Sequence, residues 1–303
     1  MKTIFIWADS SWAIGKVHQN IEKYLSNEFE FIYCDWASWE QKGALQNEYR
    51  MCDLFMSCYI THYTIEQNFP DINYKKCIFV SHGFEEMENN NPPNNATYGT
   101  TSNSILHLFP SKCKPFVVPN GVELDNFIHR EHSGLINSIG WCGRPNIYFK
   151  QFNWAVEIAK QFGTILNVAS KTPFDDWNDW NDWKPLLTNE MNNWYSTIDI
   201  LLITSIPNGE SETGPLPAFE AIASGVVVIG TPVGNFMEIP GPKFDTVNEA
   251  VSILNDLKSN PEKVKLIARE QYRSVVENWN YKVIAEKWRT MFYSALERSK
   301  SID

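Results

Sequence analysis

The sequence predicts an α/β fold made of two doubly wound parallel sheets. Strand-like and helix-like signals alternate along nearly all of its 303 residues, as in sheets whose strands are joined by helices. Several strand-like runs are apolar at successive positions and rich in β-branched residues, which is typical of strands buried on both faces. The alternation has two consecutive rounds that meet near residue 121, so we expect two domains, each long enough to have its own core.

The two rounds set the expected element bounds. In the first round we expect strands at 2–7, 29–34, 54–59, 77–81, 96–101 and 116–118, and helices at 16–25 and 103–109. In the second we expect strands at 136–141, 164–169, 198–204 and 226–230, and helices at 153–162, 217–224, 248–257, from 261 onward, and at 281–298. Residues 1–122 then form the first domain and residues 123–280 the second, and residues 281–303 form a helix that is expected to cross back to the first domain.

The helices are predicted from apolar positions that recur at helical spacing. In the first of them, Val17, Ile21 and Leu25 share one face. Asn260 and Pro261 form a helix start, because a capping residue precedes a proline that needs no hydrogen-bond donor. The last helix has one apolar face, formed by Ile284, Trp288, Met291, Phe292 and Ala295.

Two biased stretches are expected to be loops. Residues 88–95 are almost entirely Asn and Pro and contain no side chains that would pack in a core. Residues 176–183 repeat Asp, Trp and Asn with a period of three. We expect the tryptophans of this second loop to cover their domain or to line a groove for an acceptor.

Composition and charge exclude several function classes. The net charge is −10, and no cluster of Lys and Arg could neutralise a nucleic acid backbone, so nucleic acid is not expected as a partner. No apolar run reaches 18 residues, which predicts no transmembrane segment but leaves peripheral membrane contact open. The stretch from Met1 to Trp7 is too short for a signal peptide, and the six cysteines show no CxxC pairing. We therefore expect a cytoplasmic protein with reduced thiols.

The most informative stretch runs over residues 198–230. A very short helix lies there between two buried strands, which places its N-terminus at the carboxyl edge of the sheet, where backbone N–H groups and the helix dipole favour anions. Pro217 suits the first turn of this helix, and Gly225 suits its end. Yet two carboxylates, Glu212 and Glu220, occupy the same stretch, separated by seven residues.

Two roles are possible for these carboxylates. Capping of a helix N-terminus stabilises an acid by about 0.3–1 kcal/mol and would explain Glu220 alone. Alternatively, a carboxylate can accept two hydrogen bonds from a vicinal diol, so two acids could hold a ribose and a hexose at the two ends of a diphosphate. Such a diphosphate requires cations, and Arg144 and Lys150, six residues apart, are the available pair.

The first round offers weaker candidates. A loop is expected over residues 9–15, where Gly15 is placed like the glycine of a phosphate loop, although an ordinary connection fits equally well. His82 follows a strand at its carboxyl end, where ligands bind in α/β sheets, but a single histidine in such a place is also often structural.

Four features together resemble a known family. They are the run Val-Pro-Asn-Gly-Val at 118–122 followed by Phe127, the pair Gly143-Arg144 with Lys150, the run from Glu212 to Gly225, and the aromatic C-terminal helix. The chain resembles a retaining glycosyltransferase of the GT-B fold, family 4. This resemblance implies two Rossmann-like domains facing across a cleft, with the first on the acceptor side and the second binding the donor nucleotide.

The resemblance assigns roles to individual residues. It implies that Arg144 and Lys150 bind the donor diphosphate, that Glu220 binds the ribose, and that Glu212 contacts the transferred sugar. It implies that His82 lies near the donor sugar and that Gly15 lies over the phosphates. The remaining contacts with the sugar nucleotide would come from the backbone of Thr213, Gly214, Pro215 and Leu216, through N–H groups at each of these residues except the proline.

The implied activity is the transfer of a hexosyl group from a nucleoside-diphosphate sugar, most readily a UDP- or GDP-sugar, to a sugar-containing or other acceptor, with retention of configuration. No cofactor and no metal are expected, and His129 and His132 lack partners at ligand spacing. Two alternatives stay open: a nucleoside-diphosphate-sugar epimerase and a non-catalytic sugar-nucleotide-binding protein.

The sequence also departs from the family pattern. Ile14-Gly15 stands where two glycines are usual, Gln151 follows Lys150 where glycine is usual, and Pro145 follows Arg144 where leucine is common. The turn after the strand at 164–169 reads Ala-Ser-Lys at 169–171 instead of being rich in glycine, which affects the expected base site.

Overall fold

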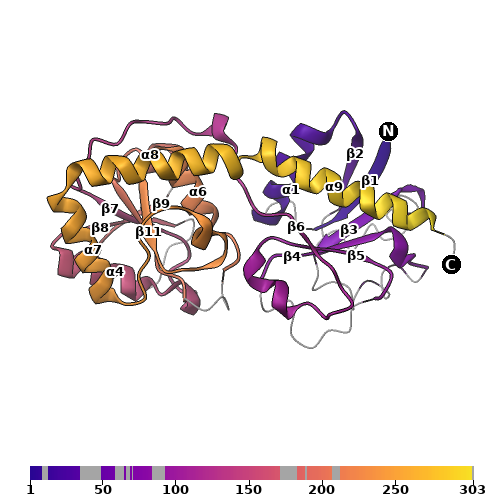
Figure 1. Cartoon of the computed structure of the whole chain (residues 1–303), viewed down its shortest axis with the longest axis horizontal. Coiled ribbons are helices and arrows are strands. Elements are labelled where there is room, and N and C mark those ends of the chain that lie inside the picture. Colours follow the sequence, from indigo (N-terminus) through magenta and orange to yellow (C-terminus); the bar gives the residue numbers. More distant parts are fainter. Residues whose placement is uncertain are drawn as a thin grey trace. The chain divides into compact units, whose positions relative to one another are not determined.

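The computed structural model describes residues 1–8, 13–34, 49–58, 65, 69, 71–83, 93–170, 183–187, 190–206 and 212–301. Within these residues the chain divides into two compact units, one formed by residues 1–121 with 281–303 and the other by residues 122–280 (Figure 1). Each unit has its own parallel sheet, so the predicted α/β class with two doubly wound sheets is confirmed.

The first unit contains a six-stranded parallel sheet in the order β2-β1-β3-β4-β5-β6. Its strands are β1 (Lys2–Trp7), β2 (Phe29–Cys34), β3 (Leu54–Cys58), β4 (Cys77–Ser81), β5 (Thr97–Thr100) and β6 (Phe116–Val117). Its helices are α1 (Ala13–Leu25), the C-terminal α9 (Tyr281–Lys300), and the 3₁₀ segments η3 (Tyr74–Lys76) and η5 (Asn103–Leu108).

Alternate residues of the central strands pack on opposite faces of this sheet. Ile4 and Ile6 of β1 lie in a core that α1 and α9 cover, whereas Phe5 and Trp7 lie in a second core on the other face. Figure 1 shows α9, in yellow, beside α1. The last helix thus supplies a large part of the first unit's core, although nearly 160 residues separate it from the rest of that unit.

The second unit contains a five-stranded parallel sheet in the order β11-β10-β7-β8-β9. Its strands are β7 (Ile139–Cys142), β8 (Leu166–Ser170), β9 (Trp183–Leu187), β10 (Ile200–Ile203) and β11 (Val227–Gly230). Its helices are α4 (Phe152–Phe162), α5 (Met191–Tyr195), α6 (Leu216–Ala223), α7 (Val247–Ser259) and α8 (Pro261–Asn278), with 3₁₀ segments η6 (Leu124–Asn126), η7 (Tyr148–Lys150) and η9 (Gly234–Glu238).

This sheet is also buried on both faces. Ile200 and Leu202 of β10 pack with α4 and α7, and Leu201 and Ile203 pack with α5 and α6. Helix α8 contributes to both cores, through Val264 to the first and Val275 to the second. Burial on both faces is the reason why β10 and β11 contain only apolar residues and glycine.

Several predicted bounds are wrong. The strands predicted at 198–204 and 136–141 are shorter or shifted, since β10 covers four residues and β7 begins at Ile139. Helix α1 begins three residues before the predicted start at 16, so Gly15 lies in its first turn and not in a loop. Strand β9 begins at the end of the stretch predicted as a loop, and it tolerates Pro185 because an edge strand need not donate at every residue. The predicted loop residues 9–12, 88–92 and 176–182 lie outside the described residues.

Candidate active site

The site in the second unit is positioned by the order of its strands. From β7 the chain adds β8 and β9 on one side and then β10 and β11 on the other, so the order reverses between β7 and β10. Parallel sheets bind ligands at the carboxyl ends of the strands where the order reverses. The segments that leave β7 and β10 carry Lys150 and Glu212.

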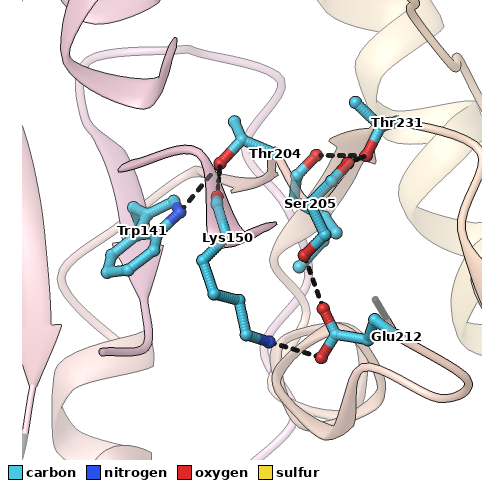
Figure 2. Close-up of polar contacts among 7 residues, drawn as sticks. Trp141, Lys150, Thr204, Ser205, Glu212 and Thr231 are labelled. Atoms are coloured by element: carbon cyan, nitrogen blue, oxygen red, sulfur yellow. Dashed lines mark hydrogen bonds and ion pairs between the residues drawn. The ribbon is translucent and has the colours of Figure 1, made fainter. Parts of the chain in front are cut away.

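Lys150 and Glu212 form an ion pair at this point (Figure 2). The Lys150 Nζ lies 2.5 Å from Glu212 Oε1, and the side chains are only 22% and 14% exposed. The other carboxylate oxygen, Oε2, accepts a hydrogen bond of 2.6 Å from the Ser205 hydroxyl. Both oxygens of Glu212 are therefore held, while the ammonium group of Lys150 has three donors and uses one of them here.

A second set of bonds fixes the segment that carries Lys150. The Thr204 hydroxyl donates to the Lys150 carbonyl at 2.8 Å and accepts from Trp141 Nε1 at 3.0 Å (Figure 2). The N–H of Ile206 donates to the carbonyl of Phe149 at 2.8 Å. Since Trp141 lies on β7 and Thr204 directly follows β10, these bonds tie the two segments together before any ligand binds.

The loop that follows β11 contacts the backbone of the two segments that flank Glu212, at Ser205 and at Thr213. The Thr231 hydroxyl donates to the Ser205 carbonyl at 2.5 Å. Gly234 has a φ of +44°, and a Cβ on it would lie 2.3 Å from the Thr213 carbonyl oxygen. The Asn235 N–H donates to that same carbonyl at 2.9 Å. Glycine is thus required at 234, because the backbone around Thr213 approaches it so closely.

Gln151, directly after Lys150, has a left-handed backbone with φ 45° and ψ 50°. It is the one non-glycine residue with a positive φ in the described part of the chain. The side-chain Oε1 of Gln151 is buried and has no hydrogen-bond partner among the described residues. Glycine adopts this conformation without a steric penalty, so the position has the geometry that suits the glycine usual in the resembled family.

The two remaining predicted donor residues of this unit have different surroundings. Arg144 follows β7 and is exposed, and its guanidinium makes no hydrogen bond or ion pair with the described residues. Glu220 lies on α6, and its Oε2 accepts a hydrogen bond of 2.9 Å from the Tyr195 hydroxyl. Helix α6 begins at Leu216, directly after Thr213, Gly214 and Pro215.

The predicted residues of the first unit lie around α1. His82 follows β4, and its ring lies edge-on to that of His18 on α1, with 6.1 Å between centroids. Neither ring nitrogen of His18 has a partner among the described residues. Burial lowers the pKa of His18 to about 3, with a further contribution from His82, and burial lowers the pKa of His82 to about 4. Both rings are therefore neutral at physiological pH.

His129 and His132 contact backbone groups. The Nδ1 of His129 lies 3.3 Å from the Ala223 carbonyl, and the Nε2 of His132 lies 3.0 Å from the Asp199 carbonyl. No group of three or more potential metal-ligating side chains occurs in the described ranges. None of their helices has the length and apolar character needed to cross a bilayer.

The structure thus brings Lys150 and Glu212 together and gives Glu220 a separate partner. Sequence reasoning missed the residues that hold these three, namely Trp141, Tyr195, Thr204, Ser205 and Gly234. Each of the first four contributes one side-chain hydrogen-bonding group. Its partner lies at a separation in sequence that follows no recognisable spacing pattern. Gly234 had a detectable signal, since Pro232 and Gly234 follow a predicted strand as turn residues do.

Comparison with known proteins finds a family model that covers most of this site. A family model described as "Glycosyl transferase-like" matches residues 151–290. This part of the chain is therefore similar to glycosyl transferase-like domains. The matched residues start directly after Lys150 and include Ser205, Glu212, Glu220 and Tyr195. No curated protein matches the chain in sequence.

Solved structures show that the whole chain has the GT-B fold. HepE of Anabaena in complex with UDP-glucose is 12% identical, with a TM-score of 0.75 over 97% of this chain and 100% of its own. A glycosyltransferase from Rickettsia africae is 14% identical, with a TM-score of 0.72 over 98% of this chain and 99% of its own. The N-terminal domain of a Candida albicans trehalose-6-phosphate phosphatase is 10% identical, with a TM-score of 0.67 over 97% of both chains. Because a domain of a phosphatase also shares this fold, the fold alone does not determine the activity.

Proposed function

We propose that the chain is a metal-independent glycosyltransferase that moves a hexosyl group from a nucleoside-diphosphate sugar to an acceptor with retention of configuration. The observation that carries the proposal is the Lys150–Glu212 pair, held by Ser205 at the point where the strand order of the glycosyl transferase-like domain reverses. A bound UDP-glucose in a structurally similar protein supports a UDP-sugar as donor.

In the proposed reaction the bond between the sugar C1 and the diphosphate oxygen breaks. The acceptor hydroxyl oxygen forms the new bond on the same face, and its proton leaves with the diphosphate. Negative charge grows on the leaving diphosphate, where Arg144, Lys150 and the N-terminus of α6 would stabilise it. Glu212 would bind the transferred hexose, and Glu220 the ribose.

Ligand-induced thermal shifts test the donor part of the proposal. A ligand that binds only the folded state raises the melting temperature by mass action. We expect a UDP-sugar or a GDP-sugar to raise it, and an ADP-sugar to serve as a comparison. No shift with any of the three at millimolar concentration would contradict the proposal.

Variants of the site test the catalytic part. We expect Glu212→Gln, Arg144→Ala and Lys150→Ala each to reduce transfer at least tenfold, measured as nucleoside diphosphate released with a panel of mono- and disaccharide acceptors. Each removes about 1.4 kcal/mol or more of transition-state stabilisation at that magnitude. Lys160→Ala, which changes an exposed lysine of α4, is the matched control and should retain wild-type activity. Wild-type rates in all three site variants would refute the proposal.

The same assays separate the alternatives. An epimerase would convert the donor sugar without an acceptor, which product analysis after incubation with donor alone detects. A non-catalytic binding protein would bind the donor tightly and show neither hydrolysis nor transfer. The placement of Gly15 inside α1 is the observation that favours this second alternative, because the loop expected to bear a phosphate-binding glycine is not formed at that residue.

A further inference from the structure

Tyr195 joins the site through a contact that no part of the sequence pattern indicated. It is the last residue of α5, and its side chain is fully buried. Its hydroxyl donates to Glu220 Oε2 at 2.9 Å and lies 3.4 Å from the carbonyl of Pro217 in the first turn of α6. Tyr195 therefore contacts both the helix that carries Glu220 and the Glu220 carboxylate itself.

The position of Tyr195 is fixed from several sides. The guanidinium of Arg130 donates to the carbonyl of Tyr195 at 2.8 Å and also to the carbonyls of Ser196 and Ile198. The Tyr195 ring packs against Trp194, at 5.2 Å between centroids, and against Phe127, at 6.2 Å. A ring held in this way presents its hydroxyl at one place, so the hydrogen bond orients Glu220 and not the tyrosine.

The phenol is also a permanent donor. Burial, together with the negative charge of Glu220, raises the pKa of Tyr195 well above its usual value of 10. The hydroxyl thus keeps its proton throughout the physiological pH range. Because a carboxylate offers about four acceptor positions, a bond from Tyr195 still leaves capacity for a diol.

We infer that Tyr195 is a positioning residue that orients the Glu220 carboxylate for the two ribose hydroxyls and thereby sets the preference for ribonucleotides over 2′-deoxyribonucleotides. This inference rests on the proposed function, in which Glu220 binds the donor ribose. A site built to accept a hydrogen bond from a hydroxyl discriminates against an analogue that lacks it. The discrimination depends on a carboxylate held in one orientation, since a mobile carboxylate can turn to follow the remaining hydroxyl.

The test compares dissociation constants by titration calorimetry. The ligands are UDP or GDP, whichever base the thermal-shift screen selects, and the corresponding 2′-deoxynucleoside diphosphate. We expect the wild type to prefer the ribonucleotide at least tenfold and Tyr195→Phe to prefer it threefold or less. Both constants come from one preparation, so a partly unfolded fraction cancels from their ratio.

Two further variants frame the result. Glu220→Gln should reduce the preference at least as far as Tyr195→Phe does. Tyr98→Phe is the matched control, because Tyr98 is a buried tyrosine of the first unit whose hydroxyl donates to the Pro93 carbonyl, and it should retain the full preference. Should Tyr195→Phe not fold, 4-aminophenylalanine in place of Tyr195 keeps a donor and should keep the preference. The similarly sized 4-methylphenylalanine lacks the donor and should lose the preference.

The outcomes separate the inference from the proposed function. If Tyr195→Phe retains the wild-type preference while Glu220→Gln loses it, the inference is wrong and the proposed function stands. A wild type that binds the ribonucleotide and its deoxy form equally overturns the inference and the ribose role of Glu220. A wild type that binds neither UDP nor GDP overturns the proposed function and the inference together.

Discussion

At the scale of single residues, the site depends on how the Glu212 carboxylate is held. Lys150 occupies one oxygen and Ser205 the other, and Thr231 in turn holds the backbone of Ser205 (Figure 2). Hydrogen bonds to charged groups contribute about 1.5–3 kcal/mol, more than bonds between neutral groups. Ser205 is therefore the residue outside the predicted set whose loss should affect the chemistry most directly.

We expect Ser205→Ala to lower the turnover number about tenfold, because Glu212 would lose the partner of its Oε2 and would no longer be held in one orientation. The change should be seen in kcat for nucleoside diphosphate release, with the folded state preserved, since only one hydroxyl is removed. Ser259→Ala, at the exposed end of α7, controls for the loss of a serine hydroxyl elsewhere. An unchanged kcat in Ser205→Ala would show that Lys150 alone orients Glu212.

Site residues could be predicted from the sequence where their residue type is unusual for the surrounding stretch. Glu212 and Glu220 stand out because two carboxylates lie around one short helix between two apolar strands, and capping of the helix would explain only one of them. Ser205 and Tyr195 could not be predicted in this way, because serine is common in loops and tyrosine in cores. Their roles follow only from contacts that form in the folded structure. Gln151 departs from the pattern of the resembled family, and its left-handed backbone explains why glycine is usual at this position.

At the scale of elements, the regular strands were predictable and the irregular ones were not. Strands buried on both faces require unbroken apolar runs, which the sequence shows for β4, β10 and β11. Helix α5 has five residues and so is too short to show a period of 3.6. Strand β9 includes a proline and adjoins a repeat of Trp, Asn and Asp, so its pairing with β8 is decided by the tertiary context.

The end of α6 was predicted at Gly225, and the structure shows how strict that requirement is. Gly225 has a φ of +85°, and a Cβ on it would lie 1.9 Å from the carbonyl oxygen of Arg130. Gly163, at the end of α4, has a similar φ of +80°, but a Cβ there would meet nothing within 4 Å. The two glycines share the same left-handed backbone conformation and differ in how closely other atoms approach them.

We therefore expect Gly225→Ala to lower the free energy of unfolding by about 3 kcal/mol or more, and Gly163→Ala to lower it by about 1 kcal/mol. The common part is the cost of a left-handed alanine, and the difference is the cost of displacing the Arg130 backbone. Urea unfolding of both variants measures the two values under identical conditions. Equal losses would mean that the segment around Arg130 moves aside without cost.

At the scale of the whole molecule, the first unit is discontinuous in sequence. Its core on the α1 side contains eight side chains of α9, namely Tyr281, Ile284, Ala285, Trp288, Met291, Phe292, Ala295 and Leu296. The second unit is continuous, and its two ends meet, since Val122 forms a β-bridge with Asn280 and donates its N–H to the Trp279 carbonyl. We propose that each unit folds by itself, provided that the first keeps α9.

Expressed fragments should show this directly. Residues 122–280 should unfold cooperatively on heating, because their cores are complete without the rest of the chain. Residues 1–121 should not unfold cooperatively, because without α9 one face of their sheet would be largely uncovered. The loss of apolar burial would be on the order of 10 kcal/mol, at about 1.5–3 kcal/mol for each large side chain of α9. Residues 1–121 joined to 281–303 through a short Gly-Ser linker should regain a cooperative transition. A short linker is sufficient because residues 122 and 280, the two ends of the unit that it replaces, pair in a β-bridge and lie about 5 Å apart. Circular dichroism and calorimetry of the three fragments check these outcomes.

Cooperative unfolding of residues 1–121 alone would show that α9 packs on a unit that is already complete. The proposal that the first unit needs α9 to fold would then be wrong.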